Sequence, residues 1–156
     1  MKKNITLEKN IHFPVLLTEV ENLCSNIQKG DFLDCTFGGG GYSLHLLKKT
    51  NSRIDAVDRD KNIKYLADEI KKKFPKRFRF FIQKFSQIGE TFKDKKFDAI
   101  IFDLGLSSYQ LKDLSRGFSF KSKDKLSMDM GLSDLNLIEV INSIDEKNLK
   151  LILKVY

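Results

Sequence analysis

This 156-residue chain lacks several features that define whole classes of protein. Its two cysteines, Cys24 and Cys35, are too few for a disulfide framework or a cysteine-rich metal site, and each is better interpreted as a small buried hydrophobe. His12 and His45 have no third ligand at a useful spacing, so no metal centre is expected. No run of about 18 apolar residues could span a bilayer, and the basic N-terminus has no apolar signal-peptide core. We therefore expect a cytoplasmic protein with no membrane partner.

The chain also has fewer acidic than basic residues: 21 aspartates and glutamates against 28 lysines and arginines, which gives a net charge of +7. A basic chain suits a nucleic-acid partner. The absence of tryptophan and the excess of lysine over arginine are equally what A/T-rich coding would give. The densest basic run, residues 71–79, is explained as well by a solvated helix end. With 41% hydrophobic residues and charges spread among them, the composition is that of one globular domain.

What the chain does have is a run of four glycines, Gly38–Gly41, between a short apolar stretch and a helical pattern. Phe32 and Leu33 predict a buried strand, and the leucines of residues 44–47 predict the inner face of a helix. Glycines let the backbone turn tightly and approach a ligand, and the first N–H groups of a helix favour a polar or anionic ligand group. The pattern therefore predicts a loop that binds a nucleotide-type cofactor.

Strand and helix patterns alternate on either side of this loop. Before it, a helix is expected with Pro14 in its first turn and one apolar face made of Leu16, Val20, Leu23 and Ile27. The expected strands are residues 31–36, 54–57, 78–82 and 97–102, and the helices between them end near residue 49, span 63–74 and lie near 87–92. This order predicts an α/β fold with a parallel sheet flanked by helices.

The pattern changes after Asp103. Residues 105–129 are rich in Ser, Lys and Asp and predict a long functional loop. Two further helices are expected, residues 134–143 capped by Ser133 and residues 146–156 capped by Asp145. No further strand is expected, so the predicted sheet stops at four strands.

Three classes of ligand could use the glycine loop. A P-loop would end in Gly-Lys-Ser/Thr, and no lysine follows Gly41. A dinucleotide fingerprint G-x-G-x-x-G lacks its third glycine here, so that match is partial. The loop of S-adenosylmethionine-dependent enzymes places an acidic residue before the glycines, and Asp34 stands there. This third class fits best.

Two more aspartates are expected at the same edge of the sheet. Asp58 ends the second strand, 20 positions after Gly38, where a carboxylate can accept hydrogen bonds from ribose hydroxyls. The alternative role of a helix N-cap is already filled by Asp60. Asp103 ends the fourth strand, where its position favours the ligand crevice over the alternative of a turn aspartate.

Several segments together resemble one family. They are His12–Leu17, Asp34–Gly41, Val57–Asp60, Phe102–Ser108, Gln110–Leu111 and Arg116–Phe120, the last reading RGFSF. Their order and spacing follow the family across nearly the whole chain. On these segments the sequence resembles the RsmH/MraW family of bacterial small-subunit ribosomal RNA (cytosine-N4)-methyltransferases.

The resemblance implies a Rossmann-like class I methyltransferase that uses S-adenosyl-L-methionine to methylate N4 of a cytidine in the decoding region of 16S ribosomal RNA. Its partners would be ribosomal RNA and the small ribosomal subunit. The family's cofactor contacts fall on Gly40, Gly41, Tyr42, Asp58, Phe85, Asp103 and Gln110. Asp103 is also the candidate catalytic residue, with the carbonyls of Leu104 or Gly105, because it could accept hydrogen bonds from the reacting amine. By its own pattern, Phe85 would be interpreted as ordinary core.

The sequence departs from the family pattern at four positions. They are Tyr42 where histidine is usual, Tyr109 where proline is usual, Lys112 where aspartate is usual, and Asp129 where arginine is usual. The exchange at Asp129 reverses the charge of a loop that would face RNA. Phe118, Phe120 or Tyr109 could stack on a splayed base, and for the two phenylalanines the alternative is anchoring of the loop in the core.

Length is the largest departure, because members of the family are much longer. The expected organisation is a partial cofactor-binding Rossmann-like domain over residues 1–112, then a loop and the start of an inserted helical domain over 113–156. Such an incomplete sheet would leave an unpaired strand edge and exposed apolar helix faces. Two alternatives stay open: a methyltransferase acting on DNA or protein, and a non-catalytic remnant that binds cofactor or RNA.

Overall fold

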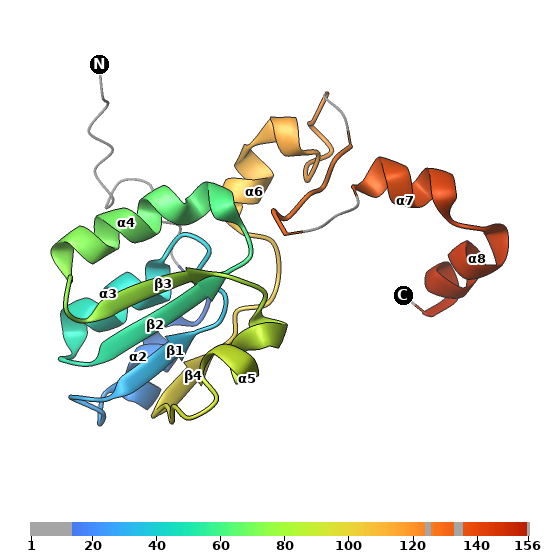
Figure 1. The fold of residues 1–156 in the computed structure, drawn as a ribbon. Coiled ribbons are helices and arrows are strands. Elements are labelled where there is room, and N and C mark those ends of the chain that lie inside the picture. Colours follow the sequence, from blue (N-terminus) through green and yellow to red (C-terminus); the bar gives the residue numbers. More distant parts are fainter. Residues whose placement is uncertain (1–13, 124–125, 133–135, 156) are drawn as a thin grey trace, which may run out of the picture.

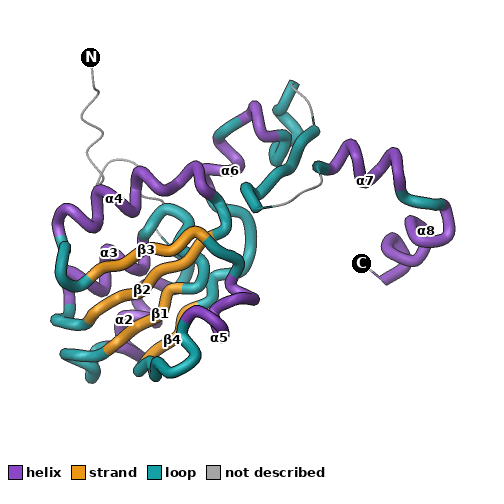
Figure 2. The backbone as a smooth tube through the Cα atoms, in the orientation of Figure 1, coloured by secondary structure: helices purple, strands orange, loops and turns teal. Residues whose placement is uncertain are grey.

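A four-stranded, all-parallel sheet in the order β3-β2-β1-β4 forms the centre of the molecule (Figures 1 and 2). The computed structural model describes residues 14–123, 126–132 and 136–155. The strands are β1 (Asp31–Asp34), β2 (Arg53–Asp58), β3 (Phe78–Ile82) and β4 (Ala99–Ile101). All four predicted strands are confirmed; β1 ends two residues earlier than predicted, and β4 is shorter than predicted at both ends.

Three helices cover one face of this sheet (Figure 1). They are α2 (Leu17–Cys24), α3 (Gly41–Lys49) and α4 (Lys64–Lys73), the last preceded by a 3₁₀ turn at Lys61–Ile63. On the other face, the described residues contribute the short α5 (Ile88–Thr91), which follows a 3₁₀ turn at Phe85–Gln87. Helices on both faces of a parallel sheet are what the alternating pattern predicted.

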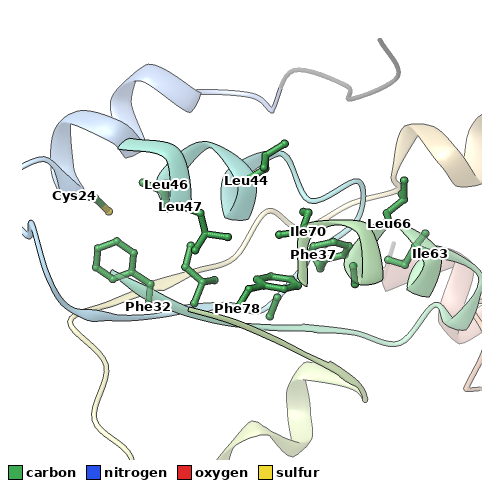
Figure 3. Close-up of a cluster of buried hydrophobic side chains, with 13 residues drawn as sticks. Cys24, Phe32, Phe37, Leu44, Leu46, Leu47, Ile63, Leu66, Ile70 and Phe78 are labelled. Carbon is green, nitrogen blue, oxygen red and sulfur yellow. The ribbon is translucent and has the colours of Figure 1, made fainter. Parts of the chain in front are cut away.

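The main core lies between the sheet and the three-helix layer. Leu46 and Leu47 of α3 and Ile70 of α4 pack against Phe32 of β1 and Phe78 of β3, and all five side chains are fully buried (Figure 3). Burying a side chain of this size stabilises the fold by about 1.5–3 kcal/mol. This packing fixes α3 on the sheet and so sets where its N-terminus, at the glycine loop, lies.

The second face has a thinner core. Leu33, Cys35 and Val57 are buried there under partly exposed aromatic side chains. Two edge-to-face contacts join these aromatic rings, Phe81–Phe92 at 5.3 Å and Phe92–Phe97 at 5.4 Å between centroids. Both cysteines of the chain are free and buried, one under each helix layer, which confirms their interpretation as small hydrophobes.

The predicted face of the first helix is wrong at two positions. Leu16 and Leu23 are exposed, and the buried side of the helix is formed instead by Leu17 and, two turns later, by Cys24. Residues 17, 20, 24 and 27 follow the helical period as well as residues 16, 20, 23 and 27 do, so periodicity could not choose between them. Pro14 is also not in the first turn, because α2 begins at Leu17 after a left-handed Leu16.

The predicted loop 105–129 contains more structure than expected. It holds α6 (Ser108–Lys112) and a 3₁₀ turn at Leu114–Arg116. The Ser107 hydroxyl accepts the Gln110 N–H, and the Gln110 side chain accepts the Ser107 N–H in return. This reciprocal capping box starts a helix too short to give a periodic signal.

Two C-terminal helices follow, α7 (Leu137–Ser143) and α8 (Glu146–Val155). Asn136 caps α7, and the predicted cap Ser133 lies outside the described residues. Asp145 caps α8 as predicted, accepting the Asn148 N–H at 2.9 Å. Both helices extend away from the sheet (Figure 1), and their described side chains are not buried, so the predicted exposure of apolar helix faces is confirmed.

The edge formed by β4 is open within the described residues. β4 pairs with β1 on one side and with no described strand on the other, and Ile100 is 53% exposed. This confirms the predicted unpaired edge. Among the helices of the described ranges, none is long and apolar enough to cross a membrane.

Candidate functional site

A cavity of about 450 Å³ opens at the carboxyl ends of the strands. Its lining comes from the ends of all four strands and the loops that follow them: residues 35–39, 41 and 42 after β1, 58 and 59 at the end of β2, 84–86 after β3 and 103–110 after β4, joined by Pro14, Val15 and Met130. Parallel strands bring their carboxyl ends to one edge of the sheet, which is where α/β proteins bind ligands. The cavity volume lies within the usual range for small-molecule sites, roughly 300–1,000 Å³.

The glycine loop uses its glycines for different purposes. Gly38 and Gly40 have φ values of +52° and +75°, which L side chains rarely adopt. A Cβ on Gly40 would also come within 2.7 Å of the side chains of Phe37 and Ile70. Of the predicted cofactor residues, Gly40 is the one that packs inward and does not line the cavity, whereas Gly41 lines it at the start of α3.

Asp34, the acidic residue before the glycines, is 1% exposed and does not line the cavity. Its carboxylate accepts the Ser43 hydroxyl at 2.7 Å and the Thr36 N–H at 3.2 Å, which ties the end of β1 to the first turn of α3. Burial raises the pKa of Asp34 from 3.8 to about 6, against these hydrogen bonds and with a further contribution from the nearby carboxylates of Asp58 and Asp103. Asp34 therefore shapes the loop from beneath.

Asp58 lines the cavity at the end of β2. One of its carboxylate oxygens accepts the Gly38 N–H at 2.8 Å, and the other accepts the Asp60 N–H at 2.9 Å. Burial raises its pKa even though these backbone donors oppose the shift. Asp58 thus fixes the glycine loop while it also presents its carboxylate to the cavity. The helix-cap role belongs to Asp60, which accepts the Asn62 N–H at 3.0 Å as predicted.

Tyr42 and Asp103 both line the cavity. The Tyr42 ring is buried and its hydroxyl donates to the Val15 carbonyl, so it anchors the segment before α2. Burial raises the pKa of the Tyr42 hydroxyl, and the charge of Asp103 adds to the shift. The Asp103 N–H donates to the Thr36 hydroxyl at 2.7 Å, while the residue itself is exposed.

Phe85 is not core. Its side chain is 46% exposed, lines the cavity and meets Phe102 edge to face at 5.8 Å between ring centroids. The interpretation from its own sequence pattern is therefore wrong. The exposed Phe85 ring in the cavity lining offers an apolar surface against which a flat ring could pack.

Gln110 is buried and lines the cavity. Its side-chain oxygen accepts the Ser107 N–H at 2.9 Å, and its side-chain nitrogen donates to Asp60 at 3.4 Å. The amide is thus held in place by the protein on both of its atoms. The structure brings six of the predicted cofactor residues to one cavity and leaves Gly40 just beneath it.

Arg116 was not predicted to belong to the site. Its guanidinium donates to the Asp60 carboxylate at 2.5 Å and to the Asp129 carbonyl at 2.7 Å, and the two ion-pair side chains are 11% and 1% exposed. It also lies over the Phe118 ring, 5.3 Å from the centroid. Arg116 and Asp60 are 56 residues apart, so no local sequence signal could pair them.

The departures from the family pattern fall at different places. The Tyr109 ring lines the cavity and would lie 2.9 Å from a Cβ on Gly39. The Asp129 side chain accepts the Gly131 N–H at 2.6 Å and so closes a turn. Of the two candidate stacking residues in the RGFSF segment, Phe118 is buried, whereas Phe120 is fully exposed. In the part of the chain that the structure describes, no group of His, Cys, Asp and Glu could hold a metal ion.

Comparison with known proteins gives a consistent result. The model of the MraW methylase family matches residues 9–156. The chain is 43% identical over 139 residues to ribosomal RNA small subunit methyltransferase H of Rickettsia canadensis and 41% identical over 138 residues to that of Rickettsia massiliae. Each match covers 88% of this chain and 45% of the relative, so the chain spans about half the length of these relatives.

A solved structure from Clostridium thermocellum, provisionally named as an rRNA methylase, superposes with a TM-score of 0.51 at 16% identity. The match covers 62% of this chain and 55% of that one. At this identity the likeness concerns the fold alone, and it agrees with a Rossmann-like sheet.

Proposed function

The chain belongs to the MraW methylase family, and from this premise we propose that it binds S-adenosylmethionine for N4-methylation of a cytidine in 16S ribosomal RNA. The observation that carries the proposal is the cavity at the carboxyl edge of the sheet, lined by the glycine loop, Asp58, Phe85, Asp103 and Gln110. These are the residues on which the family's cofactor contacts fall.

The residues present fit this cofactor. Gly41 lines the cavity where α3 begins, and the first N–H groups of a helix have no partner within the helix, so they can bind a ligand carboxylate. Asp58 can accept hydrogen bonds from ribose hydroxyls, and Phe85, whose ring is supported by Phe102, can pack against the adenine. The carboxylates of Asp34, Asp58 and Asp103 lie close enough together to affect one another, and their charge favours a cationic ligand.

For methyl transfer to the amine, the main task of the protein is to align the amine with the methyl group of the cofactor. When bound, S-adenosylmethionine supplies an electrophilic methyl group on a sulfonium. The lone pair of a cytosine N4 amine is delocalised into the ring, so the amine is a poor nucleophile. Asp103 and the carbonyls of Leu104 or Gly105 can orient the amine and accept its hydrogen bonds as it changes geometry. These residues follow β4 at the cavity, which supports Asp103 as the catalytic candidate.

Ribosomal RNA and the small ribosomal subunit are the proposed partners. The net charge of +7 supports a polyanionic partner. Phe120 is fully exposed next to Lys121, so an aromatic ring and a cation are available together for a splayed base and its phosphate. We assign most of the cofactor site to a partial domain over residues 1–112, and RNA contact to the loop and helices of 113–156, which also contribute Met130 to the cavity.

Calorimetric titration of the purified chain with S-adenosylmethionine and, separately, with NAD tests the cofactor. Binding of NAD without binding of S-adenosylmethionine would refute the proposal. Asp58→Ala should weaken cofactor binding by on the order of 1–3 kcal/mol through the loss of a buried hydrogen-bonding partner. Asp68→Ala is the matched control, because Asp68 lies on exposed α4 surface in an ion pair with Lys64.

Methyl transfer is tested separately, because the chain spans only 45% of its relatives. Labelled methyl groups should be transferred to small-subunit RNA and not to a DNA oligonucleotide of the same sequence. Transfer to DNA would favour a methyltransferase of another substrate class. Cofactor binding without transfer to either would favour a binding module that needs further sequence for turnover.

A further inference from the structure

Residues 126–132, which we call the strap, reach the cavity although they lie far along the chain from the glycine loop. Met130 of the strap lines the cavity. The strap carries a left-handed Met128, whose N–H donates to the Arg116 carbonyl at 2.9 Å. Within the strap, the Asp129 carboxylate accepts the Gly131 N–H at 2.6 Å. The strap is therefore a defined turn held at the cavity.

Arg116 connects the strap to the turn after β2. One arm of its guanidinium donates to the Asp60 carboxylate at 2.5 Å, and the other donates to the Asp129 carbonyl at 2.7 Å. The planar fork of arginine can serve two acceptors at fixed angles, which a lysine ammonium does not reproduce. Asp60 is almost fully buried, and Arg116 is the cation that pairs with it there.

Asp60 also receives the side chain of Gln110, on the same oxygen that receives Arg116. Its backbone N–H donates to Asp58, and Asp58 in turn accepts the N–H of Gly38. A continuous chain of hydrogen bonds thus runs from the strap through Arg116 and Asp60 to the glycine loop. Each link is between groups that line the cavity or support a group that does.

Gly131 lets the strap lie against the turn after β2, and this contact does not involve Arg116. Its φ is +96°, and a Cβ there would come within 2.8 Å of the Arg59 carbonyl and 3.2 Å of the Lys61 nitrogen. The strap backbone therefore lies directly against the turn. A side chain at position 131 would push the strap away and leave Arg116 and Asp60 chemically intact.

We propose that Arg116 is a positioning residue for the cofactor cavity: through Asp60 it holds the strap, with Met130, and the Gln110 amide in the arrangement that binds ligand. The proposal rests on the proposed function, since it names what orders that same site. If only molecules with a docked strap bind, the apparent Kd equals the intrinsic Kd divided by the docked fraction. Loosening the strap to about a tenth docked would weaken binding about tenfold.

The test uses the full chain and titration calorimetry with S-adenosylmethionine. Arg116→Lys keeps a positive charge beside buried Asp60 and loses the second arm to Asp129, so the fold should persist. Gly131→Ala moves the strap without touching the ion pair. Arg77→Lys is the matched control, because Arg77 donates to the carbonyls of Thr50 and Leu47 at the far end of α3 and does not line the cavity.

Both strap variants are expected to weaken binding by about tenfold or more, while Arg77→Lys lowers the melting temperature and leaves Kd within about twofold. A second measurement is the rate of trypsin cleavage after Lys121 and Lys123, which lie between Arg116 and the strap. By reciprocity, ligand that prefers the docked strap should slow this cleavage in the wild-type chain.

Three results would count against the inference. If the wild-type chain binds and both strap variants bind equally tightly, Arg116 does not position the site. If Arg77→Lys weakens binding as much as Arg116→Lys does, the effect is one of general stability, and the inference also fails. If the wild-type chain does not bind S-adenosylmethionine at all, the proposed function fails first, and the inference falls with it.

Discussion

Replacing Asp34 with asparagine should remove a pH-dependent loss of folding free energy that arises from the buried Asp34 carboxyl before the glycine loop. Asp34 is 1% exposed, and burial raises its pKa from 3.8 to about 6. Asparagine has nearly the same shape and keeps an oxygen for the Thr36 N–H. Its amide can donate to the Ser43 hydroxyl, which can accept as well as donate. The substitution therefore removes charge and little else.

The sign of the effect follows from the two pKa values of Asp34. Below about pH 3.8 the carboxyl is protonated in both the folded and the unfolded chain. As the pH rises from 3.8 to about 6, the unfolded chain loses this proton first, so the wild-type protein loses stability across that window. Above it the cost is constant. A shift of about two pKa units at about 1.4 kcal/mol each gives roughly 3 kcal/mol.

Urea unfolding at several pH values between 4 and 8 measures this cost. Far-UV circular dichroism or tyrosine fluorescence can follow it, since the chain has no tryptophan. The Asp34→Asn variant should match the wild type near pH 4 and exceed its unfolding free energy by up to about 3 kcal/mol at pH 7.5. A difference that is the same at all pH values, or an asparagine variant that is less stable at pH 7.5, would refute the reasoning.

Three further predictions concern other parts of the molecule. The effect of Asp55→Asn on stability should depend on pH in the opposite sense to that of Asp34→Asn. Burial of Asp55 opposes its ionisation, but hydrogen bonds from Arg79 and Lys95 outweigh burial and lower the pKa of Asp55 below 3.8. Its destabilisation in urea unfolding should be present above pH 3.8 and vanish as the pH falls through the lowered pKa. Gly40→Ala should lower the free energy of unfolding by about 1–3 kcal/mol in thermal or urea unfolding, because φ is positive there and the new Cβ would clash with Ile70. Gly89→Ala is the control and should stabilise α5 slightly, because the space around Gly89 is open. Equal effects of the two substitutions would contradict the role given to Gly40. Phe120→Ala should leave the melting temperature unchanged and weaken RNA binding in a filter or fluorescence assay, because Phe120 is exposed. Phe118→Ala should mainly lower the melting temperature, because Phe118 is buried. An RNA affinity that Phe120→Ala does not change would exclude Phe120 from the interface.

The layered fold was predictable because its signals are local and strong. β3 was predicted residue for residue, since its apolar run begins just after Pro75, which ends the preceding helix. The inner face of α2 was not, because two sets of positions satisfy one helical period, and only the tertiary structure, which buries Leu17 and exposes Leu16, decides between them. Likewise α6 is one short turn of helix whose only sequence signal is a capping box.

The candidate site divides in the same way. Asp58 could be predicted, because the end of a parallel strand faces the ligand edge whatever the rest of the chain does. Phe85 came only from the resemblance, since an exposed and a buried phenylalanine look alike in sequence. The partnership of Arg116 with Asp60 joins residues 56 positions apart, and it depends on the path of the strap, which no local pattern encodes.

The order in which the chain is synthesised gives the glycine loop a further property. The Gly38 N–H is held by Asp58, and the Thr36 hydroxyl is held by the backbone of Asp103, which is 67 residues later in the chain. The loop is therefore made well before the groups that give it its shape. During synthesis, β1 and α3 can begin to pack early, but the cavity cannot close until β4 has left the ribosome and joined the sheet. Ligand binding by a growing chain should therefore begin only after the strap, residues 126–132, has also emerged and docked, and it would report on the completion of this half of the fold.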